Sequence, residues 1–284
     1  MTDYGLSLAL SSARMSPLNP KVFTAAILLI SSVAGCTGSE ASERGSRGAV
    51  VDSSAGTVTL GLSEATYRPT AVSAAGSLGG TISLQNPVSD SVVAVTRDAG
   101  ICGDSASASE VRAGGGGLGD ALVWVDNIGG GKPLPELRRE RLTIRGCRFA
   151  PRVIAVAAGS TINVFSADGV EHDMRFYREG AGEPVDHIRT FNAGSVVPSE
   201  KIAKAPGIVE ARSRFQPWAR GYIAVFSHPY FAVTDEKGAF KIDGLPPGTY
   251  SVKVWHERLP APAEQQVTVG ADGTGRLDLA LALR

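Results

Sequence analysis

The sequence predicts an all-β protein, and three observations support this fold class. Of the 284 residues, 34 are Gly and 16 are Pro, which predicts many turns and argues against a helical bundle. Short runs rich in β-branched residues recur along the chain, with Gly, Asp or Pro nearby. Only Leu134–Leu142 (LPELRRERL) has a helical pattern, with Pro135 in its first turn. The number and spacing of the runs favour two β-sandwiches.

The overall composition is that of a folded protein. Hydrophobic residues make up 43% and charged residues 20%, which is too apolar for a disordered chain. Lys+Arg and Asp+Glu number 28 each, so the net charge gives no sign of a nucleic-acid partner.

Residues 1–35 are expected to be an export signal. Val22–Ala34 is an apolar run preceded by Lys21. It is too short to span a bilayer, which needs about 20 residues, but it suits the hydrophobic region of a secretory signal. The run ends in VAGC at Cys36, which resembles the bacterial lipobox. This resemblance implies a lipid anchor on Cys36 and a location at a bacterial membrane, in the periplasm or on the cell surface. Ordinary signal cleavage beside an incidental Cys is the alternative.

The chain after the signal is expected to begin with a tether. Residues 36–77 are rich in Ser, Gly, Ala and Thr, which predicts a flexible connection between the lipid and the folded part. With Cys36 lipidated, two cysteines remain in an oxidising, exported context. A disulfide between Cys102 and Cys147 is therefore the default expectation, and two buried thiols are the alternative.

The expected strands fall into three groups along the chain. Before residue 128 they are Thr81–Leu84, Ser91–Thr96 and Ala121–Asp126. Between 128 and 227 they are Arg141–Ile144, Val153–Val156, Thr161–Phe165, Ile208–Ala211 and Gly221–Phe226. After 227 they are Ala239–Ile242, Tyr250–Trp255, Gln266–Val269 and Leu277–Leu283.

The last group contains a specific turn pattern. Residues 234–254 read T-D-x-x-G-x-F-x-I-x-G-L-P-P-G-T-Y-x-V-x-V, in which two Pro fix φ and Gly relieves strain. This pattern resembles the carboxypeptidase-regulatory, transthyretin-like β-sandwich, which is also classed with carbohydrate-binding-like folds. The resemblance implies the fold and indicates little about function.

A second set of motifs lies largely in residues 146–231. It comprises GCRFAP from Gly146, VEHD from Val170, QPW from Gln216 and HPYFAV from His228, followed by WHE from Trp255. These stretches resemble the cupredoxin-like proteins sometimes labelled methylamine-utilisation-like. The resemblance implies a cupredoxin-like Greek-key sandwich over residues 128–227.

The copper ligands of that family are degenerate in this chain. Members that bind copper use an upstream His, then a Cys, a His and a Met on one loop reading approximately C-x-x-H-P-W-M. Here Ser213, Gln216 and Ala219 stand at those three loop positions, and only His172 is kept. Ser and Gln are poor copper ligands and the thiolate is missing, so we expect no type-1 copper and no other cofactor.

Pieces of the transthyretin-like pattern lie on both sides of the cupredoxin-like stretch. Residues 80–82 and 118–125 loosely match its early strands. We therefore expect one transthyretin-like sandwich made of residues 78–127 with 228–284, into which residues 128–227 are inserted. Two sandwiches in series are the alternative, and the strand partners of Ala121–Asp126 discriminate between them.

Two other clusters are weaker candidates for sites. His228, His256 and Glu257 could form a metal site if the fold brings them together, and packing or capping of strand ends is the alternative. Arg152, Arg212 and Arg214, at or beside the lost ligand positions, could hold an anion, with ion pairs to nearby carboxylates as the alternative. His187 is expected in a solvent-facing loop.

The sequence favours a protein that is not an enzyme. No G-x-S-x-G elbow is present and no base is evident beside Ser213. The leading interpretation is an exported lipoprotein that acts as a binding or structural module for a protein or glycan ligand. A metal-handling or electron-transfer protein is one alternative. A carbohydrate-binding module is the other, with Trp124, Trp218, Tyr230 and Trp255 as candidate rings and burial in the core as the competing interpretation.

Overall fold

A computed structural model describes residues 66–283, apart from residues 87, 90, 108–110, 127 and 137–138. The predicted signal, Cys36 and the tether up to residue 65 lie outside this described part. The described residues belong to one compact unit that spans Ser53–Arg284. They are almost entirely β, with one short helix, α1 (Ala99–Cys102), so the all-β fold class is confirmed.

Among the described residues, no helix has the length and apolar character needed to cross a membrane.

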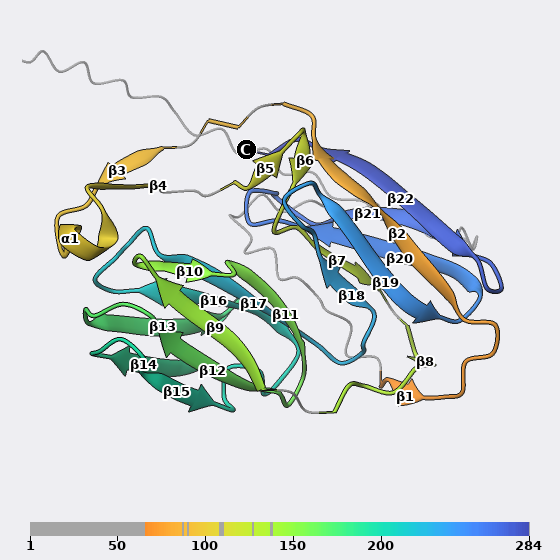
Figure 1. The fold of residues 1–284 in the computed structure, drawn as a ribbon. Coiled ribbons are helices and arrows are strands. Elements are labelled where there is room, and N and C mark those ends of the chain that lie inside the picture. Colours follow the sequence, from red (N-terminus) through yellow and green to blue (C-terminus); the bar gives the residue numbers. More distant parts are fainter. Residues whose placement is uncertain are drawn as a thin grey trace, which may run out of the picture. The chain divides into compact units, whose positions relative to one another are not determined.

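The first sandwich is built from two sheets packed face to face (Figure 1). One sheet has the order β19-β2-β6-β5, with β22 also paired to β2. Its strands are β2 (Gly76–Leu84), β5 (Ala113–Gly114), β6 (Gly117–Leu118), β19 (Ala239–Leu245) and β22 (Thr274–Leu281). The other sheet has the order β18-β7-β20-β21, with strands β7 (Leu122–Val125), β18 (Phe231–Val233), β20 (Gly248–Trp255) and β21 (Ala263–Val269).

Strands from before and after the predicted insertion pair within the first sandwich. β7 pairs antiparallel with β20, with Val123 opposite Val254, and also with β18. β2 pairs with both β19 and β22. The stretch Ala121–Asp126 thus finds its partners near and beyond residue 234, which is the arrangement expected for an inserted second sandwich.

The second sandwich is formed by the intervening chain (Figure 1). One sheet has the order β10-β9-β12-β15, with strands β9 (Arg139–Arg145), β10 (Arg148–Ala150), β12 (Thr161–Ser166) and β15 (Val196–Ser199). The other has the order β11-β17-β16-β13-β14, with strands β11 (Val153–Ala157), β13 (His172–Arg178), β14 (Asp186–Thr190), β16 (Gly207–Ser213) and β17 (Arg220–Phe226). Parallel pairs β9–β12 and β11–β17 occur beside the antiparallel ones.

The helix predicted at Leu134–Leu142 is wrong. Residues 134–136 have no regular structure, and the chain from Arg139 forms β9. Leu142 and Ile144 are fully buried while their neighbours are not, which is the period-2 pattern of a half-buried strand. β9 pairs with β10 and β12, and the backbone hydrogen bonds of these two pairings stabilise the strand more than the local helical preference of its charged residues favours a helix.

His187 lies on a strand and not in the predicted loop. It belongs to β14, which pairs with β13, so that His187 is opposite Arg175. Its side chain is exposed, and its Nε2 lies 2.8 Å from Oδ1 of Asp173. The polar residues of β14 concealed the strand because only Ile188 and Thr190 point into the protein.

A third apolar cluster, which we call the seam, joins residues of the two sandwiches. Leu122 and Trp124 of β7 and Trp255 of β20 pack with residues of the second sandwich, namely Val153, Ile208, Tyr222, Ala224 and Phe226. Val123 and Val125 point into the core of the first sandwich instead. Both faces of β7 are therefore buried, which explains why ALVWV is an unbroken apolar run.

Two short pairings complete the described part. β1 (Arg68–Pro69) pairs with β8 (Gly130–Gly131). β3 (Val92–Ala94) and β4 (Ser105–Ser107) form a hairpin that carries α1 between them. We call this segment, residues 92–107, the α1 hairpin.

Candidate functional site

The four residues that the resemblance aligns with copper ligands, here called the degenerate copper positions, lie together in the second sandwich. His172 begins β13 and Ser213 ends β16, and these strands are paired so that Met174 is opposite Ser213. Gln216 and Ala219 belong to the turn between β16 and β17. All four side chains are buried, and His172 and Gln216 are completely inaccessible.

Hydrogen bonds within this turn satisfy the side chains at these positions. Oε1 of Gln216 accepts a hydrogen bond from the Ser213 hydroxyl at 2.5 Å and lies 3.2 Å from Nδ1 of His172. The Ser213 hydroxyl accepts in turn from the Gln216 backbone N–H at 3.2 Å. The backbone N–H of Ala219 donates to the Gln216 carbonyl at 2.8 Å. The polar groups of Ser213 and Gln216 thus bond to each other and lie within hydrogen-bond distance of the His172 imidazole.

Asp168 holds the opposite edge of the His172 ring. Its Oδ2 lies 3.1 Å from Nε2 of His172 and accepts the backbone N–H of Cys147 at 2.9 Å. Its Oδ1 accepts the N–H of Gly146 at 2.7 Å. Gly146 and Cys147 form the two-residue turn between β9 and β10, and both have φ near +58°. Asp168 therefore fixes both the imidazole and a turn that contains a non-Gly residue in a left-handed conformation.

Cys102 and Cys147, the two cysteines expected to pair, are joined by a disulfide. The bond links α1 to the β9–β10 turn, so it fastens the α1 hairpin to the second sandwich. Arg97 of this hairpin stacks over the Phe215 ring at 4.1 Å and lies 3.7 Å from a carboxylate oxygen of Glu171. The α1 hairpin consequently contacts the turn that contains the degenerate copper positions.

The arginines beside the lost ligand positions have carboxylate partners. Arg152 forms a buried ion pair with Glu257, while Arg212 lies 2.6 Å from Glu210. Arg214 is 3.9 Å from Asp173. Burial raises the pKa of the Glu257 carboxyl, and the Arg152 charge opposes this shift. These contacts favour the ion-pair interpretation over a site for an external anion.

His228, His256 and Glu257 do not form a metal site in the described part of the chain. His256 and Glu257 are adjacent, with Nε2 of His256 3.4 Å from a Glu257 oxygen. His228 instead packs against aromatic rings, and its Nδ1 accepts the backbone N–H of Tyr230 at 3.2 Å. Its donor atoms do not join theirs in any group within 4.8 Å. His228 thus lies among aromatic rings, apart from His256 and Glu257.

We expect the two buried histidines to make the protein sensitive to acid. Burial lowers the pKa of His228 to about 4, and burial with the Arg152 and Arg258 charges lowers the pKa of His256 to about 3. Below pH 6.5 the unfolded chain takes up protons that the folded one excludes, so stability falls as the pH drops from 6.5 towards 4. Each histidine contributes a slope of about 1.4 kcal/mol per pH unit.

Urea unfolding of the His228→Gln variant between pH 7 and pH 5 measures this contribution. Over this range the variant should lose roughly 2 kcal/mol of the wild-type acid destabilisation, because the full slope is reached only well below pH 6.5. An unchanged slope would show that His228 does not titrate as described.

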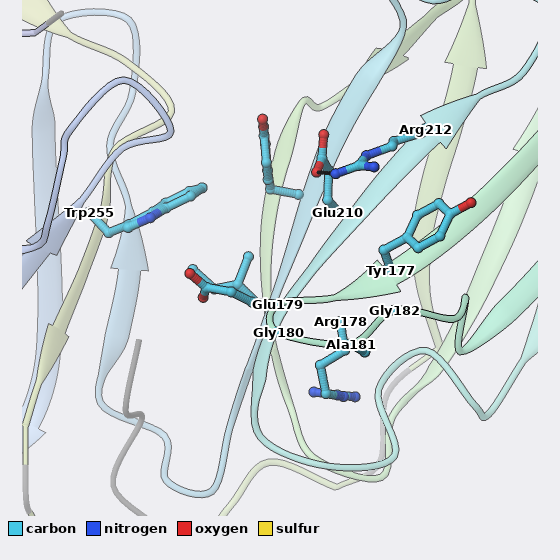
Figure 2. A pocket seen from close by; sticks show the side chains of 11 residues that line it. Tyr177, Arg178, Glu179, Gly180, Ala181, Gly182, Glu210, Arg212 and Trp255 are labelled. Atoms are coloured by element: carbon cyan, nitrogen blue, oxygen red, sulfur yellow. Dashed lines mark hydrogen bonds and ion pairs between the residues drawn. The ribbon is translucent and has the colours of Figure 1, made fainter. Parts of the chain in front are cut away.

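Two cavities lie beside the seam, and Tyr222 lines both of them. We call them the seam cavities. A cavity of about 410 Å³ is lined by Val93, Ala94, Thr96, Arg152, Pro217, Trp218, Arg220, Tyr222, Glu257 and Arg258. A second, of about 340 Å³, is lined by Tyr222 and Trp255 together with residues of β13 and β16. Figure 2 shows Trp255 across this second cavity from Tyr177, Glu210 and Arg212. Burial raises the pKa of the Tyr222 hydroxyl above its usual value.

Most of the candidate rings for sugar binding are in the core. Trp124 and Tyr230 are buried, and Trp255 is only 9% exposed. Trp218 is partly exposed, and its Nε1 donates to the Cys147 carbonyl at 3.2 Å. These four rings therefore do not form an exposed platform on the described surface.

Asp168 is the residue at this site that the sequence reasoning missed. It stands four residues before His172, in a turn that contains Gly169. The closeness of Asp168 to His172 in sequence is the one signal that could have indicated its role. The Gly146–Cys147 turn, whose N–H groups Asp168 accepts, is more than 20 residues away in the chain.

Comparison with known proteins adds a family match and structural neighbours. The family described as "Carboxypeptidase regulatory-like domain" matches residues 216–282, a range that begins inside the second sandwich and continues to β22. This match confirms the resemblance read from the turn pattern. No curated protein matches the chain.

The structural neighbours include copper proteins. A purple cupredoxin from Nitrosopumilus maritimus is 17% identical, with a TM-score of 0.26, and the match covers 30% of this chain and 98% of that one. A Cu(I) amicyanin mutant is 16% identical, with a TM-score of 0.26, over 31% of this chain and 81% of that one. A copper-containing nitrite reductase from Thermus scotoductus is 18% identical, with a TM-score of 0.27, over 36% of this chain and 25% of that one.

Proposed function

We propose that this chain is a non-enzymatic exported lipoprotein that acts as a binding module, and that its cupredoxin-like second sandwich works without type-1 copper. The observation that carries the proposal is the hydrogen-bonded set of Ser213, Gln216 and His172 at the degenerate copper positions. The lipid anchor on Cys36 and the export of the chain rest on the sequence of residues 22–36.

The donor atoms at these positions support the absence of type-1 copper. Electron-transfer copper of this kind needs a thiolate and two imidazoles, with a weak axial ligand such as Met. Here the positions offer one imidazole, a hydroxyl and an amide, and Ala219 offers no donor. Cys147 cannot supply the thiolate at this position because its sulfur is bonded to Cys102.

The seam cavities are where we expect a ligand. The larger cavity combines Trp218 and Tyr222 with the buried Arg152–Glu257 ion pair, so it offers an apolar wall as well as donors and acceptors. Such a lining suits a polar ligand, either a segment of a protein or a glycan. The burial of Trp124, Tyr230 and Trp255 makes a dedicated carbohydrate-binding module the weaker candidate.

Metal analysis of the purified protein after incubation with Cu(II) tests the copper-free state. We expect less than stoichiometric copper and none of the intense visible absorption of a thiolate–copper centre. Stoichiometric copper with that absorption in the wild-type protein would overturn the proposal.

The variant Ser213→Cys/Gln216→His/Ala219→Met provides the positive control for this experiment. Together with Nδ1 of His172 it should restore a two-His, Cys and Met ligand set and bind one coloured copper per chain. The matched variant Gln216→His/Ala219→Met lacks the thiolate and should remain without the intense absorption. A colourless triple variant would contradict the assignment of these positions.

A further inference from the structure

Three potential metal ligands converge on the far side of the His172 ring from the degenerate copper positions. In the described part of the chain, Sγ of Cys147, an oxygen of Asp168 and a ring nitrogen of His172 all lie within 4.8 Å of one another. All three side chains are buried. They come from the β9–β10 turn, the β12–β13 connection and the first residue of β13.

This cluster uses atoms that the degenerate copper positions do not use. Nε2 of His172 faces Asp168, whereas Nδ1 faces the amide of Gln216. The two groups of residues therefore share the imidazole but lie at its opposite nitrogens. A metal bound at Nε2 requires no change in Ser213, Gln216 or Ala219.

The disulfide is what keeps the cluster from acting as a metal site. Sγ of Cys147 is bonded to Cys102, and a disulfide sulfur is not the thiolate that metals bind. The backbone of Cys147 is held independently of that bond, because Asp168 accepts the N–H groups of both Gly146 and Cys147. The cysteine would consequently stay beside Asp168 and His172 after reduction.

We propose that reduction of the Cys102–Cys147 disulfide opens a zinc site formed by Cys147, Asp168 and His172. One thiolate, one imidazole and one carboxylate are typical Zn²⁺ ligands, and three protein ligands leave the fourth tetrahedral position open. The disulfide thus acts as a redox switch between a closed structural link and a metal-binding state.

The electron donor for the switch is a dithiol. One of its thiolates attacks Sγ of Cys102, the residue of the pair that retains some exposure, 6% against 0% for Cys147. The S–S bond breaks and Cys147 leaves as a thiolate. The second thiol of the reductant then displaces Cys102, which leaves a cyclic disulfide in the reductant and two reduced cysteines in the protein. Zinc binds the Cys147 thiolate, and the proton that the free thiol would carry goes to solvent.

A pair of matched variants tests the site in the full chain. Cys102→Ser and Cys147→Ser remove the same disulfide, but only Cys102→Ser keeps the thiol beside Asp168 and His172. We expect Cys102→Ser to bind one zinc per chain without any reductant. Cys147→Ser should bind zinc at least about 100-fold more weakly, because it lacks the thiolate. Equal zinc binding by the two variants, or none by Cys102→Ser, would refute the proposal.

The wild-type protein gives a measurement that does not depend on how well the variants fold. It is equilibrated in buffers of reduced and oxidised glutathione with and without zinc, and free thiols are counted by alkylation and mass spectrometry. Zinc should increase the fraction of reduced Cys102 and Cys147 at a given ratio of reduced to oxidised glutathione, since it binds only the reduced form. The Asp168→Asn/His172→Gln variant should show no such increase. A zinc-independent titration in the wild-type protein would overturn the proposal.

Discussion

Replacing Gly238 with alanine should lower the free energy of unfolding by about 2–5 kcal/mol. Gly238 has φ of +76°, a left-handed conformation that disfavours every residue with a Cβ. An added Cβ would lie 1.9 Å from the Ile82 carbonyl oxygen and 2.9 Å from the Leu118 nitrogen. Both are backbone atoms that cannot rotate away. The Ile82 N–H also donates to the Gly238 carbonyl at 2.9 Å, which enforces the close approach.

Gly270→Ala is the matched control for this prediction. Gly270 lies in the same sandwich, just after β21, and a Cβ there would meet no atom within 4 Å. Its substitution should change stability by no more than about 0.5 kcal/mol. Denaturant unfolding followed by circular dichroism measures both variants. Equal stabilities of the two variants would show that Gly238 is not needed at the β2–β19 contact.

Removing the disulfide should be the second largest single effect on stability. The bond closes a loop with a sequence separation of 45 residues, for which the chain-entropy relation gives about 4 kcal/mol. We expect the Cys102→Ala/Cys147→Ala variant to unfold at a correspondingly lower denaturant concentration. The free energy of unfolding falls chiefly because the unfolded chain gains conformational freedom without the crosslink. The native sheets should therefore stay intact.

The same variant discriminates between a global and a local role of the disulfide. In the folded variant, proteolysis should cut the α1 hairpin first, because its remaining attachments include the exposed contacts of Arg97. Unchanged denaturant stability together with unchanged proteolysis would contradict both expectations.

The sequence predicted the fold through motifs whose chemistry is local. The turn around Gly238 and the Pro-Pro-Gly turn after Leu245 depend on neighbouring residues, so their pattern is readable from the chain. β12, whose buried residues alternate with partly exposed ones, and β17, a continuous apolar run, were likewise predicted close to their observed positions. β13 and β14 were not predicted because they contain many polar and charged residues, including the buried Asp173. Their few apolar positions do not give a readable alternation.

The candidate site could be predicted only in part, because its parts are brought together by long-range pairing. The correspondence of His172, Ser213 and Gln216 to a ligand set came from a resemblance and not from their spacing. The role of Asp168 depends on the β9–β10 turn, more than 20 residues away in sequence. Arg152 of the second sandwich is paired with Glu257 of the first. The sequence around neither residue indicates this pair.

The two buried faces of β7 have a consequence for whether either sandwich could exist without the other. If residues 128–227 were deleted, Leu122, Trp124 and Trp255 would lose their cover and form an exposed apolar surface on the remaining sandwich. Conversely, the excised segment would expose Ile208, Tyr222 and Phe226. Neither part is a freely exchangeable module. Substitutions in the β16–β17 turn leave this shared layer intact, whereas removal of the whole segment 128–227 would expose it.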